Sequence, residues 1–232
     1  MSPKQESGTL ALIGGGEWQD GCRDFDTELL ARTDKEVVVL PTAAAFEHAD
    51  RVVERATDYF SGLGAKVRGL SVLRRADADD RANVAGVRDA RFVYVADGSP
   101  LHLRSALKDS ALFEAIVAAY RNGAVLAASG AGATVLCDPM VDPRGGAYTV
   151  GLGVVRDLAV FPYHGTAADH LRERSIDLLP RSATLVGLDE ETALIRDPDV
   201  TWRVAGAGVV TVYDGRQTTV VEHGSKVEQL AL

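Results

Sequence analysis

The chain has 232 residues and a formal net charge of −8, with 46% hydrophobic and 25% charged residues. These values are ordinary for a globular protein of one large domain. No basic block is present, so we expect no nucleic-acid partner. The sequence also contains no run of 18 apolar residues, so we expect no membrane span. The two cysteines lie far apart, which argues against a disulfide framework or a zinc site. The polar segment 1–8 lacks the apolar core of a signal peptide, so we expect a cytoplasmic protein.

Strand-like and helix-like segments alternate through the first half of the chain. Apolar runs predict strands over 9–13, 36–40, 67–73, 91–96 and 124–128. Amphipathic spacing predicts helices over 20–33, 48–63, 79–88 and 111–121, and a further helix that opens at Gly98-Ser99-Pro100. This alternation favours a parallel sheet with helices on both faces, and ligands of such sheets bind at the carboxyl ends of the strands.

The pattern changes after about residue 140, where short segments rich in Val, Thr and Gly predict further strands. These cover 147–150, 158–161, 184–188, 193–195, 201–204, 209–213 and 218–221, with one helix over 167–179. Asp214-Gly215 is a hairpin signal. We therefore predict an α/β fold: a three-layer sandwich with a mostly parallel sheet, helices on both faces and extra antiparallel strands in the C-terminal part. No linker divides the chain, so we expect a single domain over 1–232.

Residues 127–133, Ala-Ala-Ser-Gly-Ala-Gly-Ala, follow the fifth predicted strand and precede a helical segment. A serine nucleophile elbow has the pattern G-x-S-x-G at such a strand-to-helix turn. The pattern fits here only if Ala128 takes the place of the first glycine and Gly130 takes that of the serine. The segment therefore predicts an elbow that lacks its nucleophile.

Five ordered motifs, spread over roughly residues 10–213, resemble the cyanophycinase and aspartyl dipeptidase family of serine peptidases. This family belongs to the class I glutamine-amidotransferase-like superfamily. Besides the elbow, the motifs are Gly14-Gly15-Gly16-Glu17, Val39-Leu40-Pro41-Thr42-Ala43, Gly98-Ser99-Pro100-Leu101-His102-Leu103 and Gly187-Leu188-Asp189-Glu190-Glu191-Thr192-Ala193-Leu194. The resemblance implies serine peptidase cleavage of short peptides or aspartate-rich material. No metal-ligand spacing is visible among the five histidines, and we expect no cofactor.

The resemblance also exposes two departures from the family pattern. The family elbow reads G-T-S-A-G-A or G-S-S-A-G-A, which assigns Gly130 to the nucleophile position. By the same resemblance, the backbone N–H groups of Gly98 and Ala131 would hold the oxyanion. The family usually has two glycines in the loop after the fourth strand, where this chain has Asp97-Gly98. A carboxylate there would oppose the negative charge that develops on an oxyanion.

Two further roles, those of a base and an acid, follow from the family's catalytic triad. The resemblance implies a histidine base beyond the elbow, and His164 matches it best because it ends an apolar run; His170, in a helical stretch, is the competitor. The acid partner would be Glu190, with Glu191 and Asp142 as alternatives.

Other side chains near the elbow are weaker candidates. Ser129 lies one residue before the nucleophile position, so its side chain should leave the turn in a different direction and cap the following helix. We expect Thr134 and Cys137, further along that helix, to pack inside it.

Family substrates are acidic, so arginines that bind a carboxylate are chemically sensible. Arg104 and Arg144 are the candidates, with Asp97 beside them in the substrate-binding region. Glu17 and Trp18 are candidates for the mouth of the pocket.

Three interpretations remain open. In the first, which we favour, the chain is a peptidase homologue without hydrolysis that retains a pocket for a small peptide-like or acidic ligand. In the second, it is an active hydrolase that uses Ser129 or a water activated by His164 with Glu190 or Asp97. In the third, position 130 has been changed in an otherwise active peptidase. The sequence leaves a homodimer open.

Overall fold

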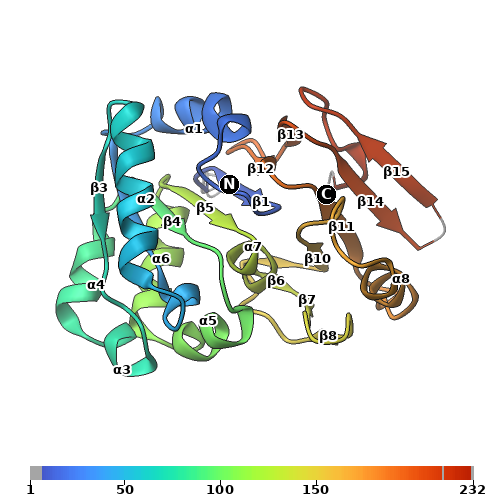
Figure 1. Ribbon diagram of the computed structural model, residues 1–232, viewed down its shortest axis with the longest axis horizontal. Helices are drawn as coiled ribbons and strands as arrows, with labels where there is room; N and C mark the ends of the chain where they lie inside the picture. The colour runs from blue at the N-terminus through green and yellow to red at the C-terminus, as the bar shows by residue number, and fades with distance from the viewer. Residues whose placement is uncertain (1–6, 216, 231–232) are drawn as a thin grey trace, which may run out of the picture.

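The computed structural model describes residues 7–215 and 217–230. Most of the predicted polar segment 1–8 therefore lies outside the described residues. Figure 1 shows the N-terminal half of the chain, in blue to green, on one side of the molecule and the C-terminal strands, in orange to red, on the other. No helix in these ranges is long and apolar enough to cross a membrane.

The first sheet contains seven strands in the order β13-β12-β1-β5-β4-β2-β3. They are β1 (Leu10–Ile13), β2 (Glu36–Leu40), β3 (Lys66–Gly69), β4 (Phe92–Val95), β5 (Val125–Ser129), β12 (Thr192–Arg196) and β13 (Trp202–Gly206). Strands β1 to β5 are parallel, and β12 pairs antiparallel with β1 and β13. The five strands predicted in the first half are confirmed, although β3 ends at Gly69.

Helices cover both faces of this sheet, as predicted. They are α1 (Arg23–Leu30), α2 (Ala49–Gly62), α3 (Arg75–Ala78), α4 (Arg81–Arg88), α5 (Pro100–Leu107) and α6 (Ala111–Arg121), with 3-10 turns η1 (Asp20–Cys22) and η2 (Thr42–Ala44). Alternate residues of β1 enter different cores: Ala11 and Ile13 pack with α1 and α2, whereas Leu10 and Leu12 pack with α4, α5 and α6. This is the period-two pattern of a strand buried on both faces.

The second sheet has the order β15-β14-β11-β10-β6-β9. Its strands are β6 (Cys137–Asp138), β9 (Val155–Arg156), β10 (Leu158–Phe161), β11 (Thr184–Leu188), β14 (Val210–Asp214) and β15 (Gln217–Val221). A small pair, β7 (Met140–Val141) and β8 (Tyr148–Thr149), lies beside it, with helix α8 (Asp169–Asp177) and the 3-10 turn η3 (Glu228–Leu230). The extra strands are thus divided: β12 and β13 extend the first sheet, β7 and β8 form a separate pair, and the others form the second sheet.

Helix α7 (Ala131–Leu136) connects the two sheets. All its residues are buried, and the core cluster that contains Leu12 of β1 also contains Val160 of β10 and Val212 of β14. In Figure 1, α7 lies in the middle of the molecule between the two groups of strands. The carboxyl ends of β1, β4 and β5 and the end of β10 therefore meet around the start of α7.

Candidate active site

The turn between β5 and α7 has the geometry of a nucleophile elbow. Strand β5 ends at Ser129, and α7 begins at Ala131. Gly130 between them has φ +48° and ψ −106°, a strained region that non-glycine residues rarely occupy. Its N–H donates to the carbonyl of Ile13 at 2.9 Å, and its carbonyl accepts from the N–H of Thr134 at 3.1 Å. The strand–turn–helix that the motif predicts is therefore built around a residue without a side chain.

The carboxylate of Asp97 lies against the start of α7 and accepts three hydrogen bonds. Its Oδ1 accepts hydrogen bonds from the N–H of Gly98 at 2.7 Å and the N–H of Ala131 at 2.6 Å. These are the two backbone donors that the resemblance assigns to the oxyanion hole. Its Oδ2 accepts a hydrogen bond from the hydroxyl of Tyr163. Both N–H groups that the resemblance assigns to an oxyanion hole therefore donate to the chain's own carboxylate.

Asp97 also fills the space that a side chain at position 130 would need. A Cβ atom built on Gly130 would lie 2.2 Å from both Cγ and Oδ1 of Asp97. Non-bonded atoms do not approach so closely, so a serine here would have to displace Asp97 from its three hydrogen bonds. The residue types at positions 97 and 130 are therefore coupled by the space that they share.

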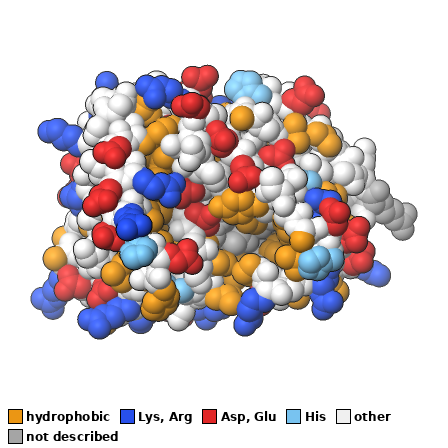
Figure 2. Space-filling view, viewed as in Figure 1, with side chains coloured by type: hydrophobic (Ala, Val, Ile, Leu, Met, Phe, Trp, Pro, Cys, Tyr) orange, Lys and Arg blue, Asp and Glu red, His pale blue; other side chains and the backbone are white. Residues whose placement is uncertain are grey.

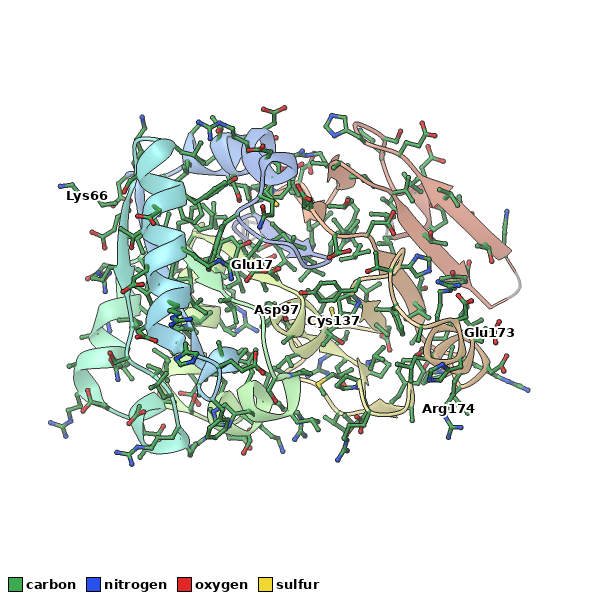
Figure 3. All side chains as sticks on the ribbon, in the orientation of Figure 1. Glu17, Lys66, Asp97, Cys137, Glu173 and Arg174 are labelled. Carbon is green, nitrogen blue, oxygen red and sulfur yellow. The ribbon has the colours of Figure 1, made fainter. Side chains whose placement is uncertain are left out.

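Ser129 faces away from the hole. It is fully buried, and its Oγ donates to Oε2 of Glu17 at 2.9 Å. Glu17 is buried rather than at the pocket mouth, as is Trp18, so that expectation was wrong. Burial raises the pKa of Glu17, and the charge of Asp97 raises it further. Figure 3 shows Glu17 and Asp97 near each other at the centre of the molecule, on the loops after β1 and β4.

The residue that reaches the elbow from the second sheet is Tyr163. It follows β10, its φ is +54°, and its N–H donates to the carbonyl of Gly14 at 2.7 Å. Its ring lies against Gly15, where a Cβ atom would be 2.3 Å from the ring. Burial, and next the negative charge of Asp97, raises the pKa of the Tyr163 hydroxyl, which favours its role as a donor.

The adjacent His164 belongs to a different cluster. Its Nε2 lies 2.8 Å from the hydroxyl of Tyr213, and its Nδ1 lies 3.7 Å from Oδ1 of Asp189. Burial lowers the pKa of His164, and the charge of Arg172 lowers it further, whereas Asp189 opposes this shift. The structure brings Tyr163, and not His164, to Asp97; a role for His164 as a base stays a prediction.

The acids singled out from the sequence have partners other than His164. Oε2 of Glu190 accepts from Oγ1 of Thr166 at 2.9 Å, and Oε2 of Glu191 accepts from the N–H of Gly21 at 2.8 Å. The acid beside His164 is Asp189, which sequence reasoning missed. The signal was present, because Asp189 begins the same Asp-Glu-Glu-Thr segment as the two glutamates.

The two arginines also have local partners. Nε of Arg104 donates to the carbonyl of Val150. Nη2 of Arg144 lies 2.6 Å from Oδ2 of Asp142, and the Arg144 side chain is largely exposed. This hydrogen bond lowers the pKa of Asp142 and engages its carboxylate outside any triad.

The remaining candidates are either exposed on α8 or buried. His170 is exposed on α8, whereas Thr134 and Cys137 are buried as expected. Oγ1 of Thr134 donates to the carbonyl of Val160 at 2.9 Å, and burial raises the pKa of the Cys137 thiol.

A cavity of about 210 Å³ opens beside Asp97. Apolar side chains from several elements line it, together with Asp97, Tyr163 and Asp142; they include Pro100, Val141, Phe161 and Leu171. Figure 2 shows a hollow edged by hydrophobic side chains near the middle of this face, where Figure 1 draws α7, β7 and β10. Within the described ranges, no group of three or more His, Cys, Asp or Glu side chains is arranged to hold a metal ion.

The α/β fold and the strand–turn–helix at Gly130 fit the class of serine peptidases that the sequence resembles. Residues 10–201 match the model of Peptidase family S51, and the chain belongs to this family.

Related proteins cover nearly the whole chain. A cyanophycinase from Geminocystis herdmanii (strain PCC 6308) is 27% identical over 93% of this chain and 84% of its own length. The solved structure of a peptidase from an acI-B1 actinobacterium is 28% identical, with a TM-score of 0.87 over 95% of this chain and 96% of that one. A putative peptidase E from Listeria monocytogenes EGD-e shares the fold, with 16% identity and a TM-score of 0.64 over 94% and 100% of the two chains.

Proposed function

We propose that this chain is a peptidase family S51 homologue that does not hydrolyse peptides through its elbow and instead binds a small peptide-like ligand in the adjacent cavity. The observation that carries the proposal is the position of Asp97. Its carboxylate accepts from both backbone donors of the oxyanion hole and lies where the nucleophile side chain would stand. Serine peptidases need a nucleophile, a base in reach of it and an empty hole, and removal of the nucleophile alone abolishes nearly all covalent catalysis.

The same position of Asp97 argues against a serine peptidase in which residue 130 alone has been changed. A serine at position 130 would overlap the Asp97 carboxylate, so an active ancestor of this site needs a different residue at 97 as well. Two coordinated changes fit a site that has adapted to another role better than they fit a single knockout.

The alternative is a hydrolase that uses Ser129 or a water activated by His164 with Glu190. The Ser129 hydroxyl is fully buried and donates to Glu17, so no substrate carbonyl can approach it in this conformation. Glu190 contacts Thr166, and the acid beside His164 is Asp189. These contacts favour the binding role over both hydrolytic routes.

The test is incubation of the protein with acidic dipeptides and, separately, with a fluorophosphonate probe read by intact mass. We expect no turnover above the buffer rate and no covalent adduct. An adduct on Ser129, or turnover that is lost in Ser129→Ala or His164→Ala, would contradict the proposal. The Thr134→Val variant is a control for hydroxyl loss next to the elbow, and it should behave like the unmodified protein in both assays.

A further inference from the structure

The cavity beside the elbow has an uneven distribution of charge. Its walls are largely apolar, with Val141, Phe161 and Leu171 among them, and its two acidic groups are Asp97 and Asp142. Asp142 is neutralised by Arg144 at 2.6 Å. No Lys or Arg of the described residues pairs with Asp97 within 4.0 Å, and none lines the cavity. The Asp97 carboxylate is therefore the cavity's uncompensated charge.

The donors that hold Asp97 leave part of its carboxylate free. Oδ1 accepts two backbone N–H groups, and Oδ2 accepts the Tyr163 hydroxyl. An ionised carboxylate offers about four acceptor sites, so Oδ2 retains one for a ligand. Because these donors come from a loop, a helix N-terminus and the end of a strand, the carboxylate is fixed at the cavity wall.

From this arrangement we infer that the cavity binds a small organic ammonium ion with an apolar body. The ammonium would donate to Oδ2 of Asp97, and the apolar part would lie against Val141, Phe161 and Leu171. Charge-assisted hydrogen bonds of this kind are roughly twice as strong as neutral ones. A ligand carboxylate would be repelled, because no cation lines this cavity in the part of the chain that the structure describes. The acidic ligand that the family resemblance implies is thus the wrong charge for this site.

The size of the cavity limits the ligand. A cavity of about 150 Å³ with apolar walls holds a benzene molecule. The 210 Å³ beside Asp97 therefore suits one aromatic ring or one branched chain carrying an ammonium group. The inference rests on the proposed function, because it assigns a ligand class to the same cavity.

The experiment compares three probes of the same shape: benzylamine, benzyl alcohol and benzoate, each titrated calorimetrically at pH 7. We expect benzylamine to bind the unmodified protein at least about tenfold more tightly than benzyl alcohol, and benzoate not to bind. Asp97→Asn keeps the acceptor oxygen for Gly98 and Ala131 but removes the charge. It should weaken benzylamine about tenfold or more and leave benzyl alcohol unchanged.

Two further variants keep the test decisive. Glu173→Gln removes one negative charge from the exposed surface of α8, and it should leave benzylamine binding unchanged. Leu171→Trp fills the cavity without touching Asp97, and it should abolish binding of both benzylamine and benzyl alcohol. If Asp97→Asn does not fold, Leu171→Trp still reports whether the cavity is the site, and the comparison of probes on the unmodified protein reports the charge preference.

Three results would overturn the inference: no benzylamine binding to the folded protein, benzoate binding as tight as benzylamine, or unchanged benzylamine affinity in folded Asp97→Asn. Failure here is distinguishable from failure of the proposed function. Hydrolysis of acidic dipeptides would contradict the loss of activity whatever benzylamine does, whereas absent benzylamine binding leaves the loss of activity standing.

Discussion

Tyr163 and His164 are joined by one peptide bond but belong to two clusters with different properties. Tyr163 donates to Asp97 in the cluster that surrounds the elbow, where two backbone N–H groups hold the same carboxylate. His164 lies between Tyr213 and Asp189 at the ends of β11 and β14. The elbow cluster opens into the cavity, whereas His164 is not among the residues that line it.

This contrast separates the residues that line the cavity from those that do not. A histidine beside an acid and a hydroxyl contains the groups of a catalytic triad. Here, however, His164 contacts Tyr213 and Asp189, and the atoms nearest to a Cβ on Gly130 belong to Asp97. The turn at Gly130 instead faces a carboxylate and a phenol, which hydrogen-bond to each other. Substitutions in the cluster around Asp97 should therefore change ligand binding in the cavity. Substitutions in the cluster around His164 should change only the free energy of unfolding.

The largest expected effect is that of a methyl group at the elbow. Gly130→Ala combines a positive φ with a Cβ atom 2.2 Å from Asp97 Cγ, and we expect a loss of about 3 kcal/mol or more in the free energy of unfolding. Urea denaturation followed by circular dichroism measures this loss.

Gly123→Ala is the matched control for that variant. Gly123 has φ +95° with nothing within 4 Å of its Cβ position, so it reports the backbone strain without the overlap. We expect about 1 kcal/mol there. Equal costs at the two glycines would show that Asp97 does not occupy the space beside Gly130.

A smaller effect is expected for the two tyrosines. Tyr163→Phe removes a donor from a carboxylate and should cost about 2 kcal/mol in the free energy of unfolding. Tyr213→Phe removes a neutral partner of His164 and should cost about 1 kcal/mol or less. Benzylamine affinity should change in Tyr163→Phe and not in Tyr213→Phe; the reverse pattern would assign the cavity to the His164 cluster.

The smallest effect is a pH dependence that belongs to His164. Its folded-state pKa is lowered, chiefly by burial, so the folded protein holds fewer protons than the unfolded chain just below pH 6.5. The free energy of unfolding is therefore highest above pH 6.5, where the His164 ring is neutral in both states. It falls as the pH drops through 6.5 toward the lower pKa of the folded state. Urea titrations at several pH values should show that the free energy of unfolding falls less steeply with decreasing pH in His164→Gln than in the unmodified protein. The same fall in both proteins would show that His164 is not its source.

Much of the fold could be predicted from periodicity. The buried run Glu36–Leu40 and the alternation of strands with amphipathic helices indicate the first sheet, because both faces of a parallel sheet are covered. The second sheet could not be predicted as separate, because a short strand pattern shows that a segment is extended but not which strand it pairs with. For example, β12 and β14 are both five-residue strands that are largely buried, yet they lie in different sheets.

The site was predictable to the level of backbone position. Gly130 lies between a strand and a helix, and the N–H groups of Gly98 and Ala131 converge on one oxygen atom, because strand ends and helix starts fix the backbone there. Side-chain direction was not predictable. The positive φ at Tyr163 decides whether residue 163 or 164 meets the elbow, and only the surrounding packing determines that angle. The choice of Asp189 over Glu190 beside His164 depends on contacts between β11 and β14 in the same way.

The most direct test of the account is a double-mutant cycle between positions 97 and 130. Gly130→Ala is measured by urea denaturation in the unmodified protein and in Asp97→Gly, which removes the overlapping carboxylate. The account predicts that the cost of the methyl group falls in the Asp97→Gly background to that of Gly123→Ala, a coupling of about 2 kcal/mol. The same cost in both backgrounds would contradict the conclusion that Asp97 occupies the space that a side chain at position 130 would need.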